Sequence, residues 1–97
     1  MIRGTTPVIV LNLPMEMQFD ALYVTFQQKK KTVFEKTLSD VLLKDNQIAI
    51  SLTQTDTLSL DSKEVVSIQL RGKIGEKAYA SKIVQTLVSD ILKDGEI

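Results

Sequence analysis

The sequence predicts an all-β protein, a single antiparallel β-sandwich of about seven strands, immunoglobulin-like, with one short helical turn. Three observations predict this fold class. Apolar residues alternate with polar ones at a period of two, short polar clusters recur between the alternating segments, and one Thr-x-x-Asp segment interrupts the pattern. A length of 97 residues suits one hydrophobic core, so residues 1–97 are expected to form one domain.

The alternation is clearest at residues 22–27, 48–53 and 65–71. In each segment every second residue is Leu, Val, Ile or Phe, which gives a strand one apolar face for the core. We expect further strands at residues 8–13, 32–37 and 41–43, and one or two within residues 78–88.

Short polar clusters at residues 28–31, 44–46, 61–63 and 72–77 separate these segments and predict tight turns. We interpret Lys29-Lys30-Lys31 as a solvated hairpin tip whose charge discourages edge-to-edge aggregation. Asp56 follows Thr53 by three residues, the spacing of a capping box, which predicts a single helical turn there.

The composition restricts the chemistry of the chain. It contains no cysteine and no histidine, which excludes zinc sites built from thiolate or imidazole ligands and catalysis by a histidine. Twelve Lys and Arg balance twelve Asp and Glu, which favours neither nucleic acid nor an acidic membrane surface as a partner. The aspartates fall at predicted turns and strand ends, where Asp commonly caps backbone amides. We therefore expect a protein that is not an enzyme and has no catalytic residues, metal or cofactor.

The N-terminal apolar run at residues 8–13 bears on location in the cell. It contains Asn12, ends at Pro14 and lacks the small-residue cleavage pattern of a signal peptide. No segment approaches the length that spans a bilayer. We expect the protein to be cytoplasmic when it is synthesised.

This same run, Val8-Ile9-Val10-Leu11, is apolar on both faces of its predicted strand. The outer face of a sandwich is normally solvated, so a second covering surface is expected. That surface is either another part of the chain, such as Ile91-Leu92, or another protein subunit, including a second copy of the chain. The candidate partner-binding residues combine this strand with the two tyrosines: Ile9, Leu11, Leu13, Tyr23 and Tyr79.

Read in order, several segments resemble a family of short proteins encoded by phages and prophages of Gram-positive bacteria. The resemblance spans nearly the whole chain and is carried by Ile2-Arg3-Gly4-Thr5-Thr6-Pro7, Leu11-Asn12-Leu13-Pro14, Leu22-Tyr23-Val24-Thr25-Phe26, Glu35-Lys36-Thr37-Leu38-Ser39-Asp40, Leu52-Thr53-Gln54, Ile68-Gln69-Leu70-Arg71 and Asp90-Ile91-Leu92-Lys93. None of these segments is a catalytic signature. Relatives often have an Asn-Gly turn where this chain has Lys29-Lys30-Lys31, which leaves the turn type of that hairpin open.

The resemblance implies a small virion-associated or assembly-associated protein. We expect a non-enzymatic structural protein of a phage head, neck, tail or baseplate, incorporated in a virion and acting through protein–protein contacts. The alternative is a β-sandwich module that binds a ligand or the host cell surface, for example a glycan. That alternative predicts exposed Tyr23 and Tyr79 beside a groove.

Overall fold

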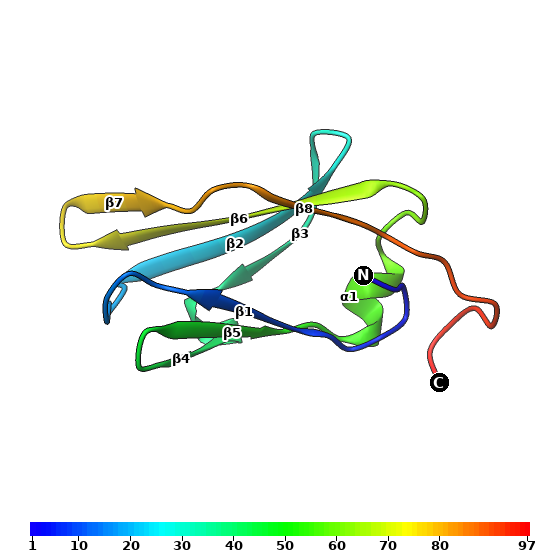
Figure 1. Ribbon diagram of the computed structural model, residues 1–97, viewed down its shortest axis with the longest axis horizontal. Coiled ribbons are helices and arrows are strands. Elements are labelled where there is room, and N and C mark those ends of the chain that lie inside the picture. Colours follow the sequence, from blue (N-terminus) through cyan, green and yellow to red (C-terminus); the bar gives the residue numbers. More distant parts are fainter.

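Two antiparallel sheets face each other in a computed structural model that describes residues 1–97 (Figure 1). The smaller sheet has the strand order β1-β5-β4, with bounds Val8–Asn12, Gln47–Ser51 and Val41–Lys44. The larger sheet has the order β3-β2-β6, followed by β7 and β8 on the outer side of β6. Its bounds are Lys31–Thr37, Ala21–Gln28, Val65–Ile74, Lys77–Ala80 and Val84–Leu87.

The predicted all-β sandwich is confirmed, with eight strands where about seven were expected. Every segment that the alternation marked contains a strand, and residues 78–88 contain two. The likeness to an immunoglobulin domain lies in the two-sheet architecture. The strand order differs from that of an immunoglobulin domain. Here β2 and β3 pair with each other in one sheet, whereas the second and third strands of an immunoglobulin domain belong to different sheets.

The core fills the space between the two sheets. Leu22, Val24 and Phe26 of β2 point into it, as their alternation predicted. The other buried apolar side chains come from both sheets and from the connecting segments: Phe19, Ile48, Ile50, Leu52, Leu60, Val66, Ile68, Leu70 and Val88. The inward faces of β2, β5 and β6 thus form one continuous apolar layer.

The predicted helical turn is α1 (Gln54–Leu58), which follows β5. The Thr53 hydroxyl accepts the Asp56 N–H at 3.0 Å, and the Asp56 carboxylate accepts the Thr53 N–H at 2.9 Å. This reciprocal pair is a capping box. A second Thr-x-x-Asp segment, starting at Thr37, forms the 3₁₀ helix η1 (Leu38–Asp40), which the sequence analysis did not predict.

The hairpin between β2 and β3 has its tip at Lys29 and Lys30, as interpreted from the charge run. Both residues have positive φ, at 53° and 64°, which is the pattern of a type I′ turn. Asn-Gly is the preferred pair for this turn. The turn type that the resemblance left open is therefore the one that an Asn-Gly pair forms.

The strands β7 and β8 form one interrupted edge along β6. Arg71 pairs with Ala80 and Ile68 pairs with Val84, which leaves one extra residue on the outer strand between these two pairs. Ser81 bridges the break, because its N–H donates to the Leu70 carbonyl and its hydroxyl accepts the Leu70 N–H. Beyond β8, Ser89 lies beside the N-terminal segment and pairs with Ile2.

Candidate functional site

The first strand presents one apolar face to the core and another to the outside. Ile9 and Leu11 are half-buried and pack against the core, as does Leu13 just after the strand. Val8 and Val10 point outward and are 58% and 49% exposed. The partner-binding residues predicted for this strand, Ile9 and Leu11, belong to the first set. Because those side chains are covered by their own chain, the outward set is the one left available to a partner.

The outward side chains of the smaller sheet form a short apolar row. Val10 of β1 pairs with Ala49 of β5, which in turn pairs with Leu42 of β4. Leu42 is 66% exposed. Residues paired across strands lie on the same side of a sheet, so these three side chains form one apolar row across it, with Val8 next to Val10 along β1. We refer to Val8, Val10, Leu42 and Ala49 as the outer apolar row.

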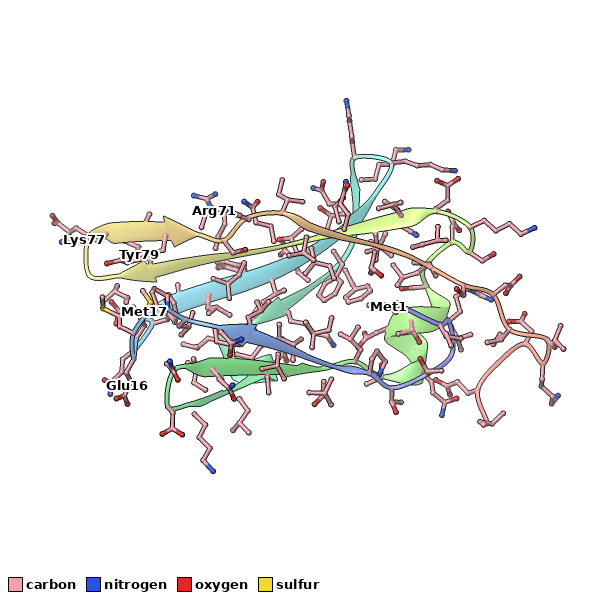
Figure 2. All side chains as sticks on the ribbon, viewed as in Figure 1. Met1, Glu16, Met17, Arg71, Lys77 and Tyr79 are labelled. Atoms are coloured by element: carbon pink, nitrogen blue, oxygen red, sulfur yellow. The ribbon has the colours of Figure 1, made fainter.

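Two of the predicted partner-binding residues lie close together outside strand β1. Leu13 and Tyr79 line the same groove of about 300 Å³, between the segment that follows β1 and strand β7. Figure 2 shows Met17 and Tyr79 at the same end of the molecule. The full lining is Asn12, Leu13, Pro14, Met15, Met17, Phe19, Leu70, Tyr79, Ala80 and Ser81. Of the five predicted residues, these two are the pair that shares a cavity.

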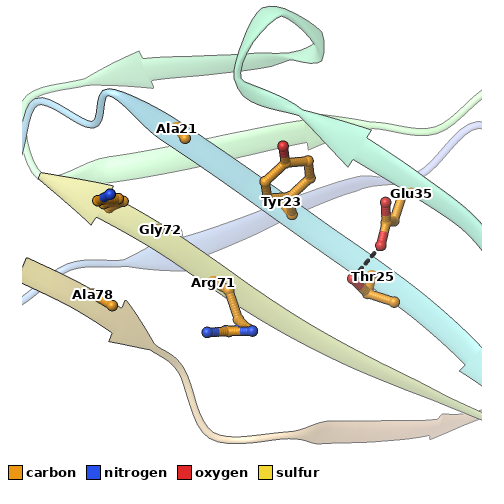
Figure 3. Close-up of a pocket in the computed structure, with 8 residues that line it drawn as sticks. Ala21, Tyr23, Thr25, Glu35, Arg71, Gly72 and Ala78 are labelled. Carbon is orange, nitrogen blue, oxygen red and sulfur yellow. Dashed lines mark hydrogen bonds between the residues drawn. The ribbon is translucent and has the colours of Figure 1, made fainter.

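Tyr23 lies on the outer face of the larger sheet, 49% exposed, beside a shallow depression of about 430 Å³ (Figure 3). The depression is also lined by Arg71, which pairs with Tyr23 across the strands, and by Lys73. Glu35 closes one side and accepts a hydrogen bond from the Thr25 hydroxyl at 3.0 Å. The floor is made of small residues: Ala21, Gly72 and Ala78.

The two tyrosines do not form one platform. Tyr79 pairs with Gly72, and Gly72 pairs with the buried Leu22. Tyr79 therefore lies on the inward side of the larger sheet, whereas Tyr23 lies on its outer side. Each tyrosine lies beside its own hollow, and the two hollows open on opposite faces, so the single groove beside both tyrosines that the ligand-binding alternative predicted is not present.

Gly72 also fixes the position of the buried Phe19. A Cβ atom at residue 72 would lie 2.5 Å from two atoms of the Phe19 ring. Because real Cβ atoms do not approach this closely, glycine is required here for close packing, and its φ is not in the left-handed region. The Gly72–Phe19 contact thus closes the core beneath both hollows.

Three carboxylates have a pKa below the ordinary aspartate value, and each is tied to local structure. Burial raises the pKa of Asp56, but the Lys36 ammonium and the Thr53 hydrogen bonds lower it by more. The backbone N–H of Thr37 lowers the pKa of Asp40. The backbone N–H of Ile91 does the same for Asp90, and Arg3 lowers that pKa further. These shifts come from capping and ion pairing and not from a group of converging acids.

Two further findings describe what the fold contains. No three His, Cys, Asp or Glu side chains lie close enough together to hold a metal ion. None of the helices has the length and apolar character needed to cross a bilayer.

Sequence reasoning missed the outer apolar row and Arg71. Val8 and Val10 were visible as half of a doubly apolar strand, but the sequence gives no sign of which half points outward. Leu42 lies in a similar segment, because Val41-Leu42-Leu43 is also apolar on both faces. Comparison with protein families, with curated proteins and with solved structures finds no match to this chain.

Proposed function

We propose that the chain is a non-enzymatic structural or assembly protein that acts through protein–protein contacts. The observation that carries the proposal is the outer apolar row, where Val8, Val10 and Leu42 are about half exposed or more on a sheet face that is normally solvated. Removing such a row from water against a protein surface lowers the free energy of the complex. The proposed partners are other protein subunits, including a second copy of the chain.

The phage assignment is part of the same proposal. It is supported by the segments that resemble short phage and prophage proteins of Gram-positive bacteria. A subunit of a head, neck, tail or baseplate makes repeated contacts with its neighbours. An exposed apolar row is suited to such contacts. We propose incorporation in a virion on these grounds.

The experiment uses a doubly charged variant of the face, Leu42→Lys with Ala49→Lys. Both side chains point outward, so we expect the fold to be retained while the row becomes charged, which circular dichroism checks. Sedimentation velocity from micromolar to millimolar concentration compares it with the native chain. We expect the native chain to associate as the concentration rises and the variant to associate at least tenfold more weakly.

A matched control adds the same charge elsewhere. Thr32→Lys with Gln85→Lys places two lysines on the outer face of the larger sheet, at exposed positions. We expect this control to associate as the native chain does. Equal behaviour of the native chain and both variants at every concentration would count against the outer apolar row as an interface.

A ligand-binding function is the second candidate, favoured by Tyr23 beside the depression that Arg71 and Lys73 line (Figure 3). An exposed aromatic ring beside charged donors is a common arrangement for binding sugars or anions. A glycan array tests it directly. Binding that is lost in Tyr23→Ala supports the ligand-binding function, and an array without any signal removes it.

A further inference from the structure

The four sheet edges differ in their protection against another strand. Edge strands normally carry charges, bulges or a cover, because their unpaired backbone groups would otherwise pair with another chain. Strand β3 carries Lys31, Glu35 and Lys36, and its pairing with β2 is irregular at Phe26. Strand β4 has four residues and ends at Lys44.

The edge formed by β7 and β8 is also protected. It is interrupted at residues 81–83 and carries Lys77 and Lys82. Next to β8, the Met1 ammonium donates to the Leu87 carbonyl, and the Arg3 N–H donates to the Ser89 carbonyl. The N-terminal segment thus already occupies part of this edge.

Strand β1 has none of these protections. No charged residue occurs between Arg3 and Glu16, so the whole strand is uncharged. It pairs with β5 without a shift in register from Val8 to Asn12. Pro7 and Pro14 bracket the strand and set the length of edge that can pair.

The hydrogen bonds at its two ends define which backbone groups are free. The Leu52 N–H donates to the Pro7 carbonyl at 3.0 Å, and the Leu13 N–H donates to the Asn46 carbonyl at 2.8 Å. Backbone groups of odd-numbered residues therefore face β5. Because the direction alternates along an antiparallel strand, the N–H and C=O groups of Val8, Val10 and Asn12 face outward.

We propose that β1 pairs with β1 of a second copy of the chain, antiparallel, with Val10 opposite Val10. This register places Val8 of each copy opposite Asn12 of the other, so that the three free N–H groups of each copy donate to the three free carbonyls of its partner. The arrangement has twofold symmetry and is self-complementary. This proposal rests on the proposed function. It specifies a second copy of the chain as the partner and the edge of β1 as the surface.

Charge favours the antiparallel direction. Met1, two residues before Arg3, lies near α1, and Glu16 lies at the opposite end of the molecule (Figure 2). Arg3 is already paired with Asp90 and Asp94 of its own chain, so the preferred direction depends on Glu16. An antiparallel pair places the two Glu16 carboxylates at opposite ends of the joined edge. A parallel pair would instead bring two Glu16 carboxylates together, which is repulsive.

The pairing also extends the outer apolar row. Val10 lies in line with Ala49 and Leu42, so the joined sheet has the order β4-β5-β1-β1-β5-β4 and carries the row twice, side by side. Two Val10 side chains, both β-branched, pack next to each other at its centre. The pair of copies presents a row twice as long as one copy does.

Amide hydrogen exchange of the native chain tests the pairing, with its control built into the strand. We expect the exchange at Val8, Val10 and Asn12 to slow at least tenfold between micromolar and millimolar concentration. The amides of Ile9 and Leu11 already bond to β5, so their exchange should not depend on concentration in this way. Exchange at the three outward amides that is unchanged by concentration would overturn the proposal.

Val10→Pro is the second test. It removes an N–H that faces outward and none that bonds to β5, so the fold is expected to persist, which circular dichroism checks. We expect exchange at the Val8 and Asn12 amides of this variant to be independent of concentration, and exchange at the same amides of Leu42→Lys to slow as in the native chain. Slowed exchange at Val8 and Asn12 in folded Val10→Pro would contradict the proposed pairing. The amides of β1 report the pairing, and the association of Leu42→Lys with Ala49→Lys reports the outer apolar row, so failure of the pairing is distinguishable from failure of the proposed function.

Discussion

Single residues show how tightly the core constrains this chain, and Gly72 is the clearest case. A methyl group at residue 72 would overlap the Phe19 ring, which is buried and has little room to move. We expect Gly72→Ala to lower the free energy of unfolding by about 1–3 kcal/mol, the range for overpacked sites. In a Phe19→Leu background the same substitution should have a smaller effect, because the ring atoms that it meets are gone. Urea denaturation of the four proteins measures this coupling, and equal effects in both backgrounds would contradict it.

The ion pair of Lys36 and Asp56 is a second constraint at this scale. The Lys36 ammonium lies 2.7 Å from the Asp56 carboxylate, and both side chains are mostly buried. It joins β3 of the larger sheet to α1, which follows the smaller sheet. We expect Lys36→Met to lower the free energy of unfolding by about 1–2 kcal/mol at neutral pH, between the values for exposed and buried pairs.

The pH dependence of that loss follows from the lowered pKa of Asp56. A carboxylate whose pKa is lower in the folded state stabilises the fold at pH values above its ordinary pKa. This contribution is lost as the pH falls through the folded-state value. The difference between Lys36→Met and the native chain should therefore shrink in acid. Lys29→Met, which removes an exposed pair with Glu64 at 3.6 Å, is the control and should change stability little at either pH.

At the scale of elements, the β2–β3 hairpin contains strain that can be removed. Lys29 and Lys30 both adopt positive φ, which disfavours side chains other than Gly, Asn and Asp. Lys29→Asn with Lys30→Gly should raise the free energy of unfolding by about 1 kcal/mol. Thermal denaturation checks it. The same pair moved by one residue, Lys30→Asn with Lys31→Gly, puts glycine in β3 and should destabilise the protein.

The elements also show what sequence could predict. Strands such as β2 have one apolar and one polar set of residues, so their inward face was predictable from Leu22, Val24 and Phe26. Strand β1 is apolar on both faces, and its inward face is set by pairing with β5, where Ile9 meets Ile50. That pairing joins residues far apart in the chain and leaves no local signal. The side of Tyr79 is likewise set by its register with β6.

At the scale of the whole molecule, the two sheets have different outer faces. The larger sheet carries Tyr23, Arg71 and Glu35 around a depression, whereas the smaller sheet carries the outer apolar row. The fold class and the inward faces of the alternating strands, such as β2, were predictable from alternation. The outer apolar row was not, because it exists only after three separate strands are brought into register.

Methyl NMR with a soluble paramagnetic probe tests most directly whether the outer apolar row is a protein-binding surface. At micromolar concentration the methyl groups of Val8, Val10 and Leu42 should be relaxed strongly by the probe, because they are exposed. At millimolar concentration we expect that relaxation to fall, while exposed Ile83 stays accessible as the reference. Methyl groups of the row that remain as accessible as Ile83 at every concentration would contradict the account.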